Sequence, residues 1–202
     1  MLKTSLPLCL AAGALALAGC NKSDSDSANG VAPEQSSEAS KAAGDQTIAA
    51  SLDQNSKFFQ AAKAVGLDAT LTGPGPYTVL VPSDDAFGQV AGDALKDPTS
   101  PQNRAEITKI LTYHILPGVI LADDISKAID TGKGKAVLAT MGGQNLTATK
   151  DGGKIILSGD GTSKSTITKA DIKASNGVIH DVDAVLVPQK SSEGDASGKQ
   201  GG

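Results

Sequence analysis

The chain has 202 residues, a length that favours one main domain with additional segments. Only 2% of the residues are aromatic, which argues against stacking platforms for single-stranded nucleic acid and against sugar sites built on aromatic rings. A net charge of −4 and an isoelectric point near 5.1 oppose non-specific binding to nucleic acid. The hydrophobic and charged fractions are otherwise those of a soluble globular protein, so we expect no nucleic-acid partner.

The first twenty residues read as a targeting segment. Lys3 provides a short basic region, and residues 6–17 form an apolar run that is too short for a membrane span. The run ends in Leu17-Ala18-Gly19-Cys20, which resembles the lipobox of bacterial lipoproteins. The resemblance implies cleavage before Cys20 and a membrane anchor of diacylglycerol on its thiol, with acyl chains such as palmitate. The alternatives are an ordinary secretory signal with an incidental cysteine, or an uncleaved anchor helix.

The residues around the cleavage point also bear on location. Cys9 lies in the removed segment, so the mature chain would keep Cys20 alone and form no internal disulfide. Asn21 is not the aspartate that favours retention in the inner membrane of Gram-negative cells, which favours the outer membrane. The sequence leaves open whether the domain faces the cell surface or the periplasm.

Composition divides the rest of the chain into three parts. Residues 20–45 are rich in Ser, Asp, Ala and Gly and predict a flexible linker after the lipidated cysteine. Residues 46–188 contain the hydrophobic patterning and are long enough to fold alone. Residues 189–202 have the character of the linker and predict a disordered tail. We therefore expect a signal peptide over 1–19 followed by linker, domain and tail.

The first half of the domain predicts helices around one strand. A helix is expected over 56–65, ended by Gly66, because glycine readily adopts the left-handed conformation of a C-cap. A β-rich strand follows over 77–81. Ser83 caps a short helix and Ser100 begins another, each with a residue type that favours a helix start.

The second half of the domain predicts mostly strands. Glycine-rich turns at 142–143 and 151–153 and the Asn-Gly pair at 176–177 are hairpin signals. Helices come first and antiparallel strands later, which indicates an α+β domain. The expected strands are 136–140, 144–150, 154–158, 166–174 and 178–187.

Three segments of the domain resemble the fasciclin-like family. They are residues 78–87 (TVLVPSDDAF), 111–118 (LTYHILPG) and 176–188 (NGVIHDVDAVLVP), and the likeness spans about residues 46–188. It implies a β-wedge of antiparallel strands with several helices packed on it, extracytoplasmic roles in adhesion or matrix contact, and no catalytic residues. Asp181 departs from the family, which more often has an apolar or small residue at this position.

Tyr113 and His114 form the family's Tyr-His segment, and two interpretations stay open. His114 follows Ile107 by seven residues, which places it on the apolar face of the expected helix as a hydrogen-bonded core residue. The resemblance instead implies partner binding, with the Tyr113 ring and hydroxyl contacting a protein. Exposure of the two side chains decides between these interpretations.

His180 and Asp183 are expected to have structural roles. In a strand His180 lies on the same face as Val178 and Val182, whereas Asp183 lies on the opposite face. This alternation and the presence of only two histidines predict no metal site and no cofactor. We expect His114 or His180 to bind a buried carboxylate such as Asp183, because an unpaired buried carboxylate is costly.

Three functions compete. The favoured one is a non-catalytic, lipid-anchored binding or adhesion module, expected to be a monomer, that contacts an unidentified protein, matrix or polysaccharide ligand. The alternative is a structural or accessory protein of the periplasmic cell envelope. A hydrolase that uses one of the histidines is a third class, although no catalytic motif supports it.

Overall fold

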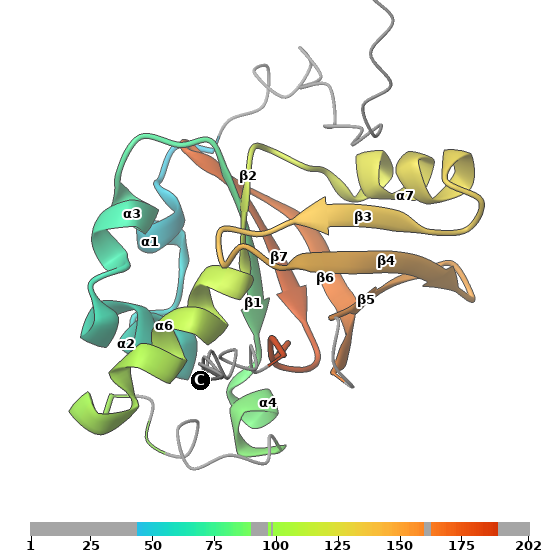
Figure 1. Ribbon diagram of the computed structural model, residues 1–202. Helices are drawn as coiled ribbons and strands as arrows, with labels where there is room; N and C mark the ends of the chain where they lie inside the picture. The colour runs from blue at the N-terminus through green and yellow to red at the C-terminus, as the bar shows by residue number, and fades with distance from the viewer. Residues whose placement is uncertain (1–43, 90–96, 98, 160–162, 190–202) are drawn as a thin grey trace, which may run out of the picture. The chain divides into compact units, whose positions relative to one another are not determined.

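The computed structural model describes part of the chain, which Figure 1 shows in colour: residues 44–89, 97, 99–159 and 163–189. Contacts divide the chain into two units, Met1–Pro33 and Glu34–Gly202, and every described residue belongs to the second. Cys20 and almost all of the expected signal peptide, linker and tail lie outside the described residues. In the described ranges, each helix is too short or too polar to cross a bilayer.

Four short helices surround the first strand in sequence: α1 (Ile48–Ser51), α2 (Lys57–Val65), α3 (Asp68–Thr72) and α4 (Asp84–Gln89). Their caps follow the sequence. The Ser56 hydroxyl accepts a hydrogen bond from the backbone of α2 at 3.2 Å, and the Ser83 hydroxyl caps α4 in the same way. Gly66 ends α2 with φ at 82°, as predicted, because this left-handed conformation is strained for residues that carry a Cβ atom.

Two longer helices lie in the middle of the chain. Ser100 precedes a short 3₁₀ segment (η2, Pro101–Asn103), and α6 follows over Arg104–Tyr113. The second helix, α7 (Ala122–Thr131), was not predicted. Leu121 occupies its N-cap, so the usual polar start signal is missing, and the sequence after Gly118 was expected to be mostly strand.

Seven strands form one sheet in the order β2-β1-β7-β6-β5-β4-β3. The predicted hairpins are confirmed in strands β3 to β7, although the last strand ends at Val182 rather than at residue 187. One pairing departs from the antiparallel pattern, since β1 and β7 run parallel. The strands are β1 (Tyr77–Pro82), β2 (Ile115–Pro117), β3 (Ala136–Ala139), β4 (Asn145–Asp151), β5 (Lys154–Ser158), β6 (Lys164–Ala174) and β7 (Gly177–Val182).

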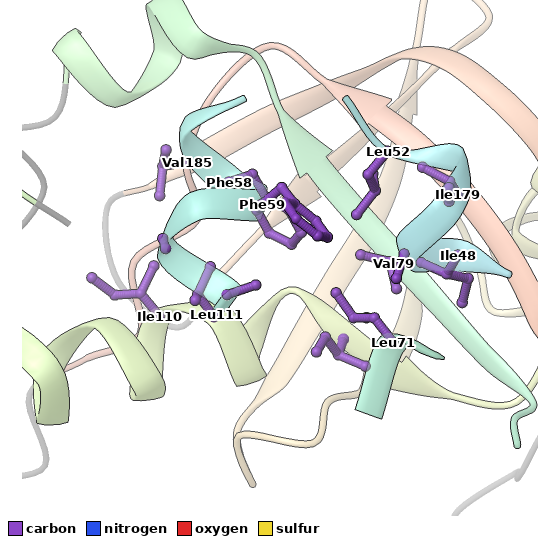
Figure 2. Packing of buried hydrophobic residues seen from close by; sticks show 14 of the residues in the cluster. Ile48, Leu52, Phe58, Phe59, Leu71, Val79, Ile110, Leu111, Ile179 and Val185 are labelled. Atoms are coloured by element: carbon purple, nitrogen blue, oxygen red, sulfur yellow. The ribbon is translucent and has the colours of Figure 1, made fainter. Parts of the chain in front are cut away.

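The sheet separates two hydrophobic cores, and strand β1 contributes to both. Val79 lies in the helix-side core, where the phenylalanines of α2 pack with α1, α3 and α6 (Figure 2). Leu80, on the opposite face of the strand, lies in the wedge core, which is lined by β3, β4, β5 and α7. The backbone N–H of Met141 donates to the Ile115 carbonyl at 2.8 Å, which joins the β3–β4 turn to β2 and curls the sheet around the wedge core.

Candidate functional site

The Tyr-His segment lies at the end of α6, between the two cores. Both side chains are fully buried, with 0% of the surface of Tyr113 and of His114 exposed. The Tyr113 hydroxyl donates to the carbonyl of Asn145 at 3.0 Å and so links the end of α6 to the start of β4. Because both side chains are buried, neither has a surface that a partner can contact. Their burial favours the structural interpretation over partner binding.

His114 uses both of its ring nitrogens on backbone groups. Nδ1 lies 2.8 Å from the Ile110 carbonyl and therefore donates, whereas Nε2 accepts the backbone N–H of Leu186 at 3.1 Å. The two contacts require the neutral ring. Burial lowers the pKa of His114 to about 4, although the hydrogen bond to Ile110 acts in the opposite direction. His114 thus fastens α6 to the closing segment after β7.

Asp183, the carboxylate that we expected to bind a histidine, has other partners. Its side chain is exposed and accepts hydrogen bonds from the backbone N–H of Thr166 at 2.6 Å and from the Ser165 hydroxyl at 3.2 Å. Partial burial raises its pKa, but these hydrogen bonds outweigh burial and hold the pKa below the usual value. The predicted bond between a histidine and Asp183 is wrong, because β7 ends before Asp183 and the backbone N–H of Leu186 reaches His114 instead.

His180 makes a second buried connection, from β7 to the start of α7. Its Nε2 donates to the Ile120 carbonyl at 2.9 Å, and its Nδ1 accepts the backbone N–H of Asp171 at 3.1 Å. Burial lowers the pKa of His180, against the hydrogen bond to Ile120 and the charges of Asp171 and Asp181, which raise it. The structural role predicted for His180 agrees with these contacts.

Asp171 is a residue of this connection that the sequence reasoning missed. It lies in β6 where the pairing with β7 shifts in register, and its φ of 59° is unusual for a non-glycine residue. Its carboxylate accepts the N–H of Ala122 at 2.9 Å and so supplies the cap that Leu121 cannot. No motif marks Asp171, and the one local signal is its residue type, because aspartate tolerates this conformation better than most residues do.

Asn176 is a second missed residue. Its side-chain amide donates to the carbonyls of Leu71 and Gly73 at 2.9 and 2.8 Å, and its side-chain oxygen accepts the N–H of Ile48 at 2.7 Å. The sequence marked Asn176 as half of an Asn-Gly turn and as the start of the third family-like segment, without a role for its side chain. In the structure it also ties α1 and α3 to the sheet.

The hydrogen bonds of His114 and His180 indicate a structural role rather than a catalytic or metal-binding one. Each ring nitrogen of His114 and His180 is engaged by the backbone, so neither ring can act as a base or bind a metal without losing a buried hydrogen bond. In the part of the chain that the structure describes, no group of three or more His, Cys, Asp or Glu side chains is placed to hold a metal ion. Asp181 is half-buried between β1 and β6, and burial raises its pKa, partly offset by Lys169.

Comparisons with known proteins identify the fold and the family of this chain. The solved FAS1 domain pair of the insect cell adhesion molecule Fasciclin I matches with a TM-score of 0.60 at 19% identity, covering 70% of this chain and 51% of that one. The Fasciclin domain model matches residues 53–188. This chain therefore belongs to the fasciclin family, which confirms the predicted family and the α+β fold.

Two curated relatives show the range of the family. Protein sll1483 of Synechocystis is 34% identical over 160 residues, which cover 77% of this chain and 82% of the relative. Transforming growth factor-beta-induced protein ig-h3 of Sus scrofa is 30% identical over 135 residues, but these cover 65% of this chain and only 17% of that protein. Sequences similar to this chain thus occur both as proteins of similar length and as small parts of much longer proteins.

Proposed function

We propose that this protein is a non-catalytic binding module, anchored by lipid on Cys20 outside the cytoplasm, that contacts protein or matrix partners. The supporting observation is the match of residues 53–188, most of the folded region, to a family with a solved member from a cell adhesion molecule. The buried contacts of His114 and His180 agree with this role, since they hold the domain together and leave recognition to its outer surface.

An adhesion assay tests the binding role. Beads that carry the full chain should adhere to surfaces coated with extracellular matrix or cell-envelope material more strongly than beads that carry the heat-unfolded chain. Equal adhesion of the two kinds of bead would contradict a role that depends on the folded surface.

The anchor and its location need separate measurements. Labelled palmitate should enter the wild-type chain but not the Cys20→Ser variant, and only the wild type should stay in the membrane fraction. Protease added to intact cells should remove a domain at the cell surface. A domain that the protease spares until the outer membrane is opened would instead support the periplasmic accessory role.

A further inference from the structure

Charge is unevenly distributed along this acidic chain. Residues 132–174, which include strands β3 to β6, contain seven lysines and three aspartates. Residues 46–131, which include the helices from α1 to α7, contain ten acidic and six basic residues. The strand layer therefore has a positive net charge, whereas the rest of the domain has a negative one, and this charge favours an anionic partner.

The outer face of this strand layer, defined by the residues that point away from the wedge core, forms aligned rows. One row crosses all four strands in register: Val137, Thr147, Ser158 and Lys164. The next row contains Thr149, Ile156 and Thr166. Burial alternates along β3, β4 and β5, so these residues face away from the buried ones between them.

Hydroxyl groups occupy the centre of the outer face. Thr147 lies directly opposite Ser158, and Thr149 is on the same side of β4 two residues further on. These three residues are half-buried, and their hydroxyls make no hydrogen bond with the described part of the chain, which leaves their hydrogen-bonding capacity for a ligand. Ile156, in the next row, belongs to neither core among the described residues.

Lysines lie at opposite ends of the outer face. Lys154 begins β5 and Lys164 pairs with Ser158 at the end of the same strand, so they are separated by about 13 Å along the strand direction at 3.3 Å per residue. Lys135 precedes Val137 by two residues and adds an exposed cation beside the first row. Asp151, opposite Lys154, adds one negative charge at that end.

We infer that the outer face of strands β3 to β6 binds an acidic polysaccharide whose sugars carry carboxylates. The terminal lysines pair with carboxylates of two sugars that are not adjacent in the polymer, because one sugar ring is much shorter than the distance between the lysines. The central hydroxyls bond hydroxyls of the sugars between them, without the aromatic stacking that this sequence lacks. An anionic bilayer fits less well, because Val137 and Met141 are the large apolar residues exposed among the described ones, too few to insert into lipid. This inference rests on the proposed binding function.

Retention of the full chain on beads of alginate, a polymer of uronic acids, tests the inference. We expect retention at low salt that weakens as salt is raised, because exposed ion pairs are screened. Beads of dextran, a neutral polymer, should not retain the chain. Equal retention on both polymers, or none on alginate, would overturn the inference.

Matched variants locate the surface. Lys154→Gln with Lys164→Gln should weaken retention about fivefold, whereas the control Lys63→Gln with Lys109→Gln, which removes the same charge from exposed positions on α2 and α6, should change it less than about twofold. Asp151→Asn should strengthen retention. An equal loss in both double variants would mean that net charge, rather than this face, causes binding and would overturn the inference.

Two further arms separate the remaining explanations. Thr147→Val with Thr149→Val removes two hydroxyls at nearly constant shape and should weaken retention about threefold; unchanged retention would overturn recognition by hydroxyls. Vesicles of phosphatidylglycerol should bind more weakly than alginate, and equal binding would favour a membrane surface. Alginate beads that retain neither the wild type nor the lysine variant would overturn the inference. If both proteins still adhere fully to matrix coatings in that case, the proposed function stands.

Discussion

The contacts of the two buried histidines differ in what surrounds the ring. Both rings are neutral, and both connect elements that are distant in sequence through backbone groups. His114 lies beside the Phe58 ring, with centroids 6.3 Å apart. His180 instead has the Asp171 carboxylate 3.8 Å from its Nδ1. The comparison shows that the same pair of backbone hydrogen bonds can form beside an aromatic ring in one place and beside a carboxylate in another.

The largest effect is expected from His114→Ala. The change opens a cavity between the two cores and leaves the buried N–H of Leu186 without an acceptor. We expect the free energy of unfolding in urea to fall by roughly 4 kcal/mol. A loss below about 0.5 kcal/mol, within the range of ordinary surface changes, would contradict the assigned role.

Acid should destabilise the domain through the same ring. The pKa of folded His114 is lowered to about 4 from the ordinary 6.5, so the unfolded chain binds the proton more readily. The contribution of His114 to the free energy of unfolding is therefore fully present above pH 6.5. It falls by roughly 3 kcal/mol as the pH is lowered to 4. Urea unfolding at pH 7 and at pH 4 measures this loss.

The variant His114→Gln serves as the control for the acid effect. It cannot titrate in this range, so most of the pH dependence should disappear, and the remainder should come from His180 and Asp183, whose pKa values are also lowered in the folded chain. If His114→Gln keeps the full acid sensitivity of the wild type, the source of that sensitivity is not His114.

Variants of Asp171 test the connection that His180 makes between β7 and the start of α7. Asp171→Ala removes the acceptor for the Ala122 N–H and should lower stability by about 1.5 kcal/mol. Asp171→Asn keeps a side-chain oxygen and tolerates the positive φ, so its loss should be less than half as large. Hydrogen exchange should quicken in the first turn of α7 in the alanine variant. Uniformly faster exchange throughout the domain would contradict a local capping role.

The smallest effect is expected at Asp183. This exposed carboxylate holds the end of β7 to β6 through the Thr166 N–H and the Ser165 hydroxyl, away from both histidines. Asp183→Ala should cost about 1 kcal/mol at pH 7 in urea unfolding. The double variant with His114→Ala should show additive losses, since the two side chains do not share a bond; strong coupling would revive a connection between them.

Local patterns predicted much of the fold. Gly66, Ser56 and Ser83 mark helix ends that the structure reproduces, because caps depend on neighbouring backbone groups. The hairpin turns were predicted for the same reason. The α7 helix was missed because its cap comes from Asp171, 49 residues further along the chain.

The sequence by itself determined the family, the order of helices before hairpins, and the placement of His180 on the strand face of Val178 and Val182, since capping, turn chemistry and the two-residue period act within a few residues. The tertiary structure alone decided the parallel pairing of β1 with β7, the backbone partners of the histidines and the exposure of Asp183. Those features depend on which distant segments meet. The termination of β7 at Val182 and the curl of the sheet bring Leu186, not Asp183, to His114.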